Sequence, residues 1–304
     1  MEKKEDPNFS SAPKLELEEL LQTLDQKINW DGRKLVKYNG FWFPMPFFPP
    51  IISTQNHFKA KESDILLASV PKSGTTWLKA LMFCIANRNI YTIDQNPLLT
   101  SNPHILVPFL ELGLYFHQEN PDLQHLSDPR FFSSHIPFNI LPNSIRDSEC
   151  KIIFICRSPL DQFISSYHFL LDNKFEKDAV PLELDEAFDI IRESVVYKYE
   201  DLKEDIAFHI EKILEFMGYP FSEEELKQGL VDQIKKLCSL ENLKNLEVNK
   251  CGYVQGIMKN SSFFRKGEVG DWTNYLTPAM AERVKKAVWP CSAIENNIRQ
   301  LVAN

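Results

Sequence analysis

Short apolar runs alternate along this chain with segments that have helical spacing. Residues 64–70 (DILLASV), 151–157 (KIIFICR) and 194–199 (SVVYKY) are runs of strand length in which apolar residues predominate. Runs of this kind are typical of strands that are buried on both faces of a parallel sheet. We therefore predict that all three are strands of one sheet.

A helix is predicted after each of these strands. Residues 75–88 have a helical pattern, residues 159–171 carry a proline in the first turn, and residues 202–218 repeat apolar positions three and four apart before a glycine. A capping-box signature at Ser222 begins one more predicted helix, which runs to Leu237. Strands that alternate with helices predict an α/β fold with a central, mostly parallel sheet flanked by helices.

The N-terminal part has a different pattern. Residues 1–14 are expected to form a disordered tail and residues 15–304 one domain, because the chain has neither internal repeats nor a long linker. Residues 15–28 place leucines at helical spacing, so a helix is predicted there. Residues 41–52 (FWFPMPFFPPII) are too short and too rich in proline for a membrane-spanning helix, and we expect irregular structure in this region.

The formal charge is −8, with 42 acidic and 34 basic side chains, so nothing in the overall charge supports a nucleic-acid or anionic-membrane partner. Any anion site must therefore be local. The six cysteines have no paired or zinc-like spacing, and neither a disulfide framework nor a metal site is predicted. The first residues lack the apolar stretch of a secretory signal, and we expect a cytoplasmic protein.

One local anion site is predicted at residues 70–77 (VPKSGTTW), between a predicted strand and a predicted helix. A helix N-terminus offers free backbone N–H groups, and a glycine lets the backbone close around an anion. Gly74, Thr75 and Thr76 would supply amides and hydroxyls, and Lys72 a positive charge. Because this lysine comes before the glycine, the segment is not a Walker A loop. By itself the motif also fits a helix cap with an exposed lysine.

Two further basic segments can reach the same ligand. Arg157 ends a predicted parallel strand, where ligands of open α/β sheets collect, and Ser165 follows two helical turns later. Arg265 and Lys266 are adjacent cations beside glycines, and a guanidinium next to a lysine suits a dianionic phosphate. Each of these residues, taken alone, also has a purely structural explanation. Arg157 would cap the sheet, Ser165 would lie on a solvated helix face, and Arg265 and Lys266 would belong to a basic surface turn.

Three motifs together resemble the cytosolic sulfotransferase family: PKSGTTW (71–77), CRSPLDQFISSYHF (156–169) and FRKGEVGDW (264–272). The sequences of these motifs are most similar to those of the plant members. The resemblance extends from about Gly40 to Leu276 and includes SNPHILVPFLE, HIPFNILP, YKYEDLKED and CSLENLKNLEVNK. It implies a fold similar to that of P-loop kinases. It also implies a cosubstrate, 3′-phosphoadenosine 5′-phosphosulfate (PAPS), and a reaction that requires no metal.

The resemblance implies a role for the residues of each motif. Those it places around the 5′-phosphosulfate are Lys72, Ser73, Gly74, Thr75 and Thr76, and those around the 3′-phosphate are Arg157, Ser165, Arg265, Lys266 and Gly267. It also implies that Lys72 stabilises the leaving phosphate, that Trp77 stacks on the adenine and that Tyr199 contacts the nucleotide. Residues 238–240 correspond to the adenine side of the site.

His135, at the end of FFSSH, is the implied catalytic base. A hydroxyl is a poor nucleophile until its proton is removed, and histidine titrates near neutral pH. The sulfuryl group would pass in line to the hydroxyl of a small hydrophobic acceptor, such as a phenol, flavonoid, steroid or lipid-like metabolite. His168 could also line the acceptor pocket. The aromatic residues expected in the pocket or in the core beside it are Phe41, Trp42, Phe43, Phe47, Phe48 and Phe138.

The chain departs from the family before its YKYED motif (197–201). Family members usually continue after LDEAFD (184–189) through a glycine- and tryptophan-containing helical segment, of which on the order of two dozen residues are absent here, judged by ordinary element lengths. This segment normally helps to wall the acceptor cavity. The tail departs as well, because AVWPC (287–291) interrupts an expected closing helix.

Two functional alternatives follow from this departure. The chain is either an active sulfotransferase with an open acceptor site, or a truncated homologue that binds the nucleotide and transfers poorly. A small-molecule kinase that uses ATP is disfavoured by the position of Lys72 and by the two segments for a 3′-phosphate. Either a monomer or a homodimer is compatible with the sequence.

Overall fold

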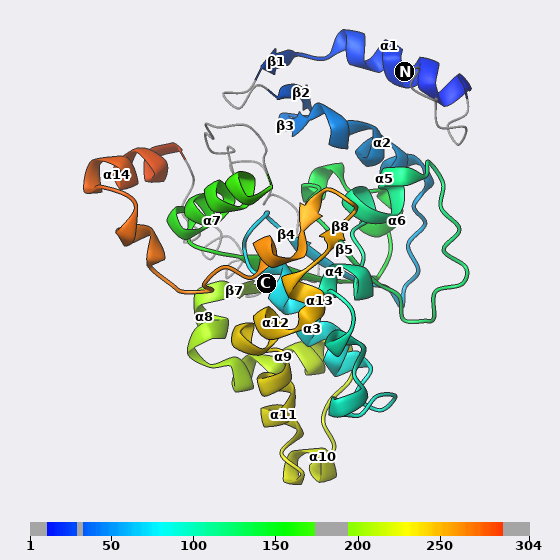
Figure 1. Ribbon diagram of the computed structural model, residues 1–304. Coiled ribbons are helices and arrows are strands. Elements are labelled where there is room, and N and C mark those ends of the chain that lie inside the picture. The colour runs from blue at the N-terminus through cyan, green and yellow to red at the C-terminus, as the bar shows by residue number, and fades with distance from the viewer. Residues whose placement is uncertain (1–10, 29–32, 174–193, 288–304) are drawn as a thin grey trace, which may run out of the picture.

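Four parallel strands form the centre of the molecule. The structure, a computed structural model, describes residues 11–28, 33–173 and 194–287 (Figure 1). The strands are β4 (Ile65–Ser69), β5 (Phe131–Ser134), β6 (Lys151–Cys156) and β7 (Ser194–Lys198), in the order β5-β4-β6-β7. All three pairings are parallel. The predicted α/β fold is therefore confirmed, and the three predicted strands extend beyond the observed ones by at most one residue at either end.

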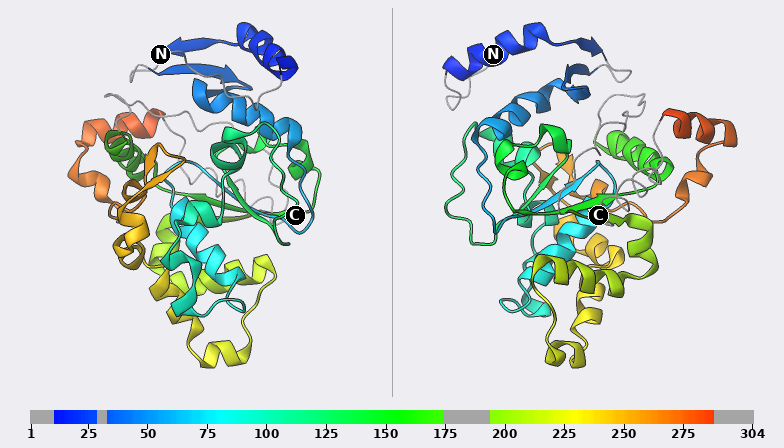
Figure 2. Two further views of the ribbon diagram at one scale, coloured as in Figure 1. Left: turned by 45° about the vertical axis from the view of Figure 1, so that its right-hand side comes forward. Right: turned by 180° about the vertical axis from the view of Figure 1, so that it is seen from behind.

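Helices cover both faces of this sheet (Figure 2). Ile65 and Leu67 point to one face, where they join a buried cluster with residues of α3 (Thr75–Ala86). Leu66 and Ala68 point to the other face and pack in a second cluster with α2 (Phe48–His57). This alternation along β4 shows that the strand is buried on both faces, as its continuous apolar run predicts.

The remaining helices complete the two layers and the rim. Four helices contribute residues to the core cluster of α3: α8 (Tyr199–Glu204), α9 (Ile206–Met217), α11 (Leu230–Leu237) and α12 (Leu240–Asn245). Two short helices adjoin them in the chain: α10 (Glu223–Lys227) and α13 (Glu247–Lys250). The other helices are α4 (Pro103–Leu106), α5 (Tyr115–His117), α6 (Asn143–Arg146), α7 (Pro159–Asp172) and α14 (Pro278–Ala287). A small hairpin of β8 (Tyr253–Val254) and β9 (Met258–Lys259) lies near the C-terminal end of the described chain.

Two predicted helices are each divided into two. Residues 202–218 belong to α8 and α9, because the side chain of Asp205 caps a new helix by accepting a hydrogen bond from the backbone N–H of Phe208 at 3.1 Å. Residues 222–237 belong to α10 and α11, which are separated by Gly229 in a left-handed conformation (φ 68°). The observed α14 ends at Ala287, and the rest of the predicted tail lies outside the described residues.

The expectation of irregular structure near the N-terminus is wrong. Strands β1 (Gln26–Ile28), β2 (Lys34–Tyr38) and β3 (Phe41–Pro44) form a separate antiparallel sheet. Asn39 and Gly40 both have positive φ (48° and 90°), which is the backbone that a two-residue hairpin turn requires. Of the four prolines at residues 44–50, Pro49 and Pro50 fall in the first turn of α2, where a missing N–H costs nothing.

The predicted N-terminal helix is shifted towards the start of the chain. It is observed as α1 (Ser11–Thr23), so residues 11–14 belong to a helix and not to a tail, and its predicted last turn is replaced by β1. The predicted tail at residues 1–10 lies outside the described residues. Within the described ranges, no helix combines the length and the apolar character that crossing a bilayer requires.

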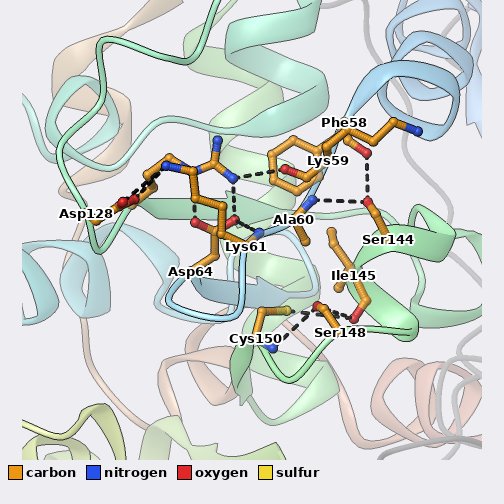
Figure 3. A network of polar contacts seen from close by, with 11 residues as sticks. Phe58, Lys59, Ala60, Lys61, Asp64, Asp128, Ser144, Ile145, Ser148 and Cys150 are labelled. Atoms are coloured by element: carbon orange, nitrogen blue, oxygen red, sulfur yellow. Dashed lines mark hydrogen bonds and ion pairs between the residues drawn. The ribbon is translucent and has the colours of Figure 1, made fainter.

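A polar network fixes the amino ends of the central strands (Figure 3). The buried guanidinium of Arg130, just before β5, donates to both carboxylate oxygens of Asp64, just before β4, at 2.8 and 2.6 Å. The same carboxylate accepts from the backbone N–H of Lys61 at 2.8 Å, and the Lys61 ammonium pairs with Asp128 at 2.9 Å. A bidentate pair that is buried on both sides is strongly orienting. The network therefore sets the alignment of the two strands whose opposite ends form the site.

Candidate active site

A cavity of about 720 Å³ lies at the carboxyl ends of the four central strands. Each strand is followed by a residue that lines it: Lys72 after β4, His135 after β5, Arg157 after β6 and Tyr199 after β7. The carboxyl ends of parallel strands meet at one edge of a sheet, which is where open α/β folds bind their ligands. The position of the cavity is therefore a direct result of the sheet topology.

The cavity brings together most of the residues that the sequence predicts for the site. Those that line it are Phe41, Trp42, Lys72, Gly74, Thr75, Thr76, Trp77, His135, Phe138, Arg157, Ser165, Tyr199, Arg265 and Gly267. Leu240 also lines it, whereas five predicted residues do not: Ser73, His168, Cys238, Ser239 and Lys266.

The loop between β4 and α3 has the backbone of an anion cradle. Lys72 has φ 69° and Gly74 has φ 105°, so two residues in three adopt the left-handed region and turn the chain into the first turn of α3. A Cβ atom on Gly74 would lie 2.6 Å from Cδ2 of Tyr199. Ser73 is 1% exposed, and its buried Oγ has no hydrogen-bond partner among the described residues. Only glycine fits at position 74, and the loop contains an unsatisfied hydroxyl.

Three cations converge at this loop. The Nζ atom of Lys72 lies 4.0 Å from the ring centre of Phe169. Burial, followed by the positive charges of Arg157 and Arg265, lowers the pKa of Lys72 to about 7. Like charges that are placed together in a cavity disfavour one another until an anion binds between them, so this part of the cavity is suited to a polyanion.

Arg157 is held from two sides. Its Nη2 donates to the backbone carbonyl of Glu268 at 2.6 Å, and its guanidinium lies 4.4 Å from the ring centre of Tyr199. It also lies 3.8 Å from the buried carboxylate of Asp161, one turn into α7. Ser165, one further turn along the same helix, lines the cavity beside it. The arginine and the serine are thus brought to one wall, as the spacing of the motif predicts.

Arg265 and Lys266 share one acidic partner. Nη1 of Arg265 lies 2.5 Å from Asp271 Oδ2, and Nζ of Lys266 lies 2.8 Å from Asp271 Oδ1. Nε of Arg265 is buried and has no hydrogen-bond partner among the described residues. The guanidinium therefore keeps a buried donor that protein groups do not use, whereas the ammonium of Lys266 is directed to the carboxylate and lies off the cavity wall.

His135 has a defined tautomer. Its Nδ1 lies 2.7 Å from the backbone carbonyl oxygen of Ser69, which can only accept, so Nδ1 carries the proton and Nε2 is left basic. The backbone N–H of His135 donates to the buried carboxyl group of Glu111 at 2.7 Å, and Ser134 Oγ donates to the same group at 2.9 Å. Burial lowers the pKa of His135 to about 3, and the imidazole is therefore neutral near pH 7.

The far end of the cavity is largely apolar. Phe41 and Trp42 of β3 line it together with Phe43, Phe47 and Phe138. Phe48 is fully buried in the core cluster of α2 and does not reach the cavity, because it begins a helix that packs on the sheet. The side chains of Lys27 and Arg33, which the sequence did not single out, also line the wall. Lys27 lies over the ring of Trp42, with Nζ 4.1 Å from the ring centre.

His168 lies outside this pocket. It is packed edge-to-face against Tyr275 with 5.0 Å between ring centres, and burial and the charge of Arg265 lower its pKa. It packs on the side of α7 that meets the 271–275 turn. Of the two α7 residues that the sequence predicts for the site, Ser165 lines the cavity and His168 does not.

Sequence reasoning missed a buried polar chain behind the loop. Thr76 Oγ1 lies 2.9 Å from His104 Nε2, and His104 Nδ1 lies 2.9 Å from Lys79 Nζ. Lys79 interrupts the apolar face of α3 and is 0% exposed. The sequence signal was a lysine in the middle of an otherwise apolar helix, which by itself does not show that the amine is buried.

Comparisons with known proteins agree with this geometry. The sequence model of the sulfotransferase domain matches residues 62–195 and 192–289. Cytosolic sulfotransferase 15 of Arabidopsis thaliana is 41% identical over 302 residues, which cover 90% of this chain and 84% of the relative. Cytosolic sulfotransferase 13 of the same plant is 39% identical, with 89% and 90% covered. The chain belongs to the sulfotransferase family, and its likeness to plant cytosolic members confirms the resemblance and agrees with the expected cytoplasmic location.

Solved structures show the same fold. An Arabidopsis thaliana putative steroid sulphotransferase superposes with a TM-score of 0.67 at 29% sequence identity, covering 93% of this chain and 95% of that one. A mouse sulfotransferase complexed with PAP superposes with a TM-score of 0.62 at 24% identity, covering 83% of this chain and 92% of that one. The second likeness concerns the fold alone. Membership of the family and the shared fold together identify the chain as a sulfotransferase.

The family match is interrupted where the sequence predicts a missing segment. Its two parts meet at residues 192–195, immediately before the YKYED motif. The alignment to the first plant relative spans 302 positions but only 90% of the 304 residues, that is about 274, which leaves about 28 positions without a counterpart here. The residues on the N-terminal side of this junction, 174–193, lie outside the described part of the chain.

Proposed function

We propose that this protein transfers the sulfuryl group of PAPS to the hydroxyl group of a small hydrophobic acceptor, with His135 as general base. One observation carries the proposal: the convergent cations Lys72, Arg157 and Arg265 share a single cavity with a histidine whose Nε2 is unprotonated. A doubly phosphorylated nucleotide needs the cations, and a hydroxyl acceptor needs the base. The nucleotide and the hydroxyl acceptor can therefore bind next to each other in this cavity.

The loop residues fit the 5′ end of such a nucleotide. Gly74 lets the backbone approach closely, Ser73 has a buried hydroxyl to donate, and the N–H groups of the first turn of α3 point to the same place. On this proposal Lys72 contacts the oxygen that links phosphate to sulfur and stabilises the charge that develops there. The resemblance also places Thr75 and Thr76 around the 5′-phosphosulfate.

The residues of the second group fit the 3′ end. Arg157 and Ser165 come from one helix–strand unit, and Arg265 and Gly267 come from a segment about a hundred residues later; all four line the cavity. The buried Nε of Arg265 is available to a phosphate oxygen. Lys266 would contribute through its charge, since Asp271 holds its ammonium off the wall. Trp77, whose ring meets that of Tyr199 edge-to-face at 5.6 Å, would offer its free face to the adenine.

In this reaction the protein places the nucleotide and the acceptor and removes the proton of the acceptor hydroxyl. The bound nucleotide supplies the sulfuryl group, whose bond to the phosphate oxygen breaks as its bond to the acceptor oxygen forms. His135 accepts the hydroxyl proton at Nε2, while the carbonyl of Ser69 holds Nδ1–H and keeps the ring in position. The apolar wall of Phe41, Trp42 and Phe138 would orient the acceptor and exclude water.

An acceptor-panel assay tests the proposal. The protein is incubated with ³⁵S-labelled PAPS and a series of phenols, flavonols, steroids and hydroxylated fatty-acid derivatives, and labelled products are counted. Sulfation of at least one class is expected. Thermal-shift titration with adenosine 3′,5′-bisphosphate, compared with ATP, tests the nucleotide separately; a larger stabilisation by ATP would favour a kinase and overturn the assignment.

A second candidate is a homologue that binds the nucleotide and transfers poorly. The interruption of the family match before β7 favours it, together with the about 28 positions of the first plant relative that have no counterpart in this chain. The two candidates differ in one measurement. Bisphosphate binding with turnover supports the enzyme, and bisphosphate binding without product on the whole panel supports the impaired homologue.

A further inference from the structure

The polar chain behind the anion loop has a direction. It runs from Thr76 Oγ1 through His104 to Lys79 Nζ, with both links at 2.9 Å, and joins helix α3 to helix α4. Thr76 lines the cavity, whereas Lys79, one turn along α3, is 0% exposed. The chain thus connects a cavity hydroxyl to a fully buried amine.

The surroundings of Lys79 decide what its amine can do. Nζ lies 3.3 Å from the ring centre of Phe109, and no carboxylate forms an ion pair with it in the described part of the chain. Burial lowers its pKa, and the charge of the buried Glu111 raises it. A buried lysine without an ion pair costs stability, and apolar residues of similar size are often as good or better at such a site. Packing alone does not account for an amine here.

With Lys79 as an ammonium, the donors and acceptors allow one arrangement. An ammonium group can only donate, so it donates to His104 Nδ1 and leaves the imidazole proton on Nε2. Nε2–H then donates to Thr76 Oγ1, so the oxygen of Thr76 is occupied as an acceptor on its inner side. Its own hydroxyl proton is left to donate outwards. The backbone N–H of His104 donates to Asn102 Oδ1 at 3.0 Å, which fixes the imidazole at the start of α4.

We propose that Lys79 is a positioning residue for the nucleotide: acting through His104, it turns the Thr76 hydroxyl so that this group donates a hydrogen bond to the 5′-phosphate. The inference rests on the proposed function, because it requires a 5′-phosphate at the start of α3. The reverse tautomer of His104 would draw the Thr76 proton inwards and present lone pairs to the anion. Lys79 prevents this arrangement without touching the ligand.

Two ligands that differ only in the 5′-phosphate test the inference. Isothermal titration calorimetry is run with adenosine 3′,5′-bisphosphate and with adenosine 3′-monophosphate on the wild type, K79M and T76V. A hydrogen bond to a charged group contributes about tenfold or more to affinity, so K79M is expected to bind the bisphosphate about tenfold more weakly. It should bind the monophosphate as the wild type does, and the double variant K79M/T76V should lose no more than either single variant.

Each control excludes a merely structural effect. L81A removes a fully buried side chain from the same helix and should lower stability while leaving the ratio of the two affinities unchanged. Equal weakening of both ligands in K79M, additive losses in the double variant, or an unchanged bisphosphate affinity would each overturn the inference. A wild type that does not bind the bisphosphate would instead overturn the proposed function and, with it, this inference.

A measurement on the wild type does not depend on the stability of K79M. Long-range ¹⁵N–¹H correlation spectra of the ¹⁵N-labelled protein report which ring nitrogen of each histidine is protonated, and H104Q assigns the signals of His104. We expect His104 to carry its proton on Nε2. A proton on Nδ1 would mean that the imidazole donates to Lys79, and the inference would be wrong.

Discussion

The hydroxyl group of Tyr199 donates a hydrogen bond to the backbone carbonyl oxygen of Gly267, with 2.9 Å between the two oxygens. The same tyrosine ring lies against Gly74, where an added Cβ would approach Cδ2 of Tyr199 to 2.6 Å. Tyr199 therefore lies between the loop that follows β4 and the segment that carries Arg265. Its position sets how far apart the two anion-binding segments are, and this distance should match the two phosphates of one nucleotide.

The variant Y199F tests this relationship. Phenylalanine keeps the ring between the glycines but removes the donor to Gly267, so we expect a loss of about 1 kcal/mol in the free energy of unfolding and weaker binding of adenosine 3′,5′-bisphosphate. Urea denaturation and calorimetry measure the two effects. Y197F is the matched control, because the buried hydroxyl of Tyr197 has no hydrogen-bond partner among the described residues and its removal should cost little. Equal effects of the two variants would contradict the assigned role.

Gly267 should not tolerate a side chain. Its φ is 63°, and an added Cβ would lie 2.5 Å from Cδ2 of Leu240 and 3.0 Å from the hydroxyl of Tyr199. Gly256 has a similar φ of 68° with open space around it. Both G267A and G256A carry the backbone cost of about 1 kcal/mol, so any additional destabilisation and loss of nucleotide affinity in G267A comes from the clash. If the two variants melt at the same temperature and bind alike, the close contact does not matter.

Nucleotide binding should take up a proton above neutral pH. Burial and the charges of Arg157 and Arg265 hold the pKa of Lys72 at about 7 in the free protein, and a bound phosphate raises it by favouring the ammonium. Because the complex then holds more protons than the free protein, affinity falls as pH rises above 7, by up to about tenfold per unit. Calorimetry in buffers of different ionisation enthalpy counts the protons directly. K72M should remove the uptake, and uptake that persists in this variant would locate it elsewhere.

Replacing the proposed base should separate turnover from binding. H135A removes the imidazole but none of the cations, so we expect turnover to fall by about two to four orders of magnitude while bisphosphate affinity changes little. H135N is a useful second variant, because its amide can still donate to the carbonyl of Ser69 and keep the pocket in shape. Activity that survives in both variants would move the proton acceptor to another group.

Three of the four central strands and the loop after β4 could be predicted from the sequence because they depend on local signals, whereas β5 was not predicted. The apolar runs fix the strands, and the sequence around Gly74 fixes the turn and the start of α3. The convergence of Arg157 and Arg265 could be predicted only through the resemblance. The two arginines are 108 positions apart, and no local sequence pattern shows that they lie close together in the fold. Their proximity results from the packing of the 260–271 segment against the end of the sheet, which no single segment of the sequence contains.

The N-terminal sheet was missed although its signal was present. Asn39 and Gly40 form one of the strongest short hairpin signals, but the prolines that follow hid it by suggesting irregular structure. Lys79 and His104 were missed for a different reason. Their roles depend on hydrogen bonds between two helices, and a lysine within an apolar segment does not show whether its amine reaches the surface or remains inside.

Within the described residues, the hairpin of β2 and β3 pairs with β1 and has no hydrogen-bonded ladder to the four parallel strands. Phe41 and Trp42, which line the apolar end of the cavity, therefore belong to a separate sheet, whereas Lys72 and Arg157 each follow a central strand. On the proposed function, the residues that would select the acceptor and those that would hold the donor are therefore encoded by different stretches of the gene. Substitutions in the N-terminal sheet would then change the acceptor while leaving the donor site intact, so one such chain could give rise to enzymes that share a donor and differ in acceptor.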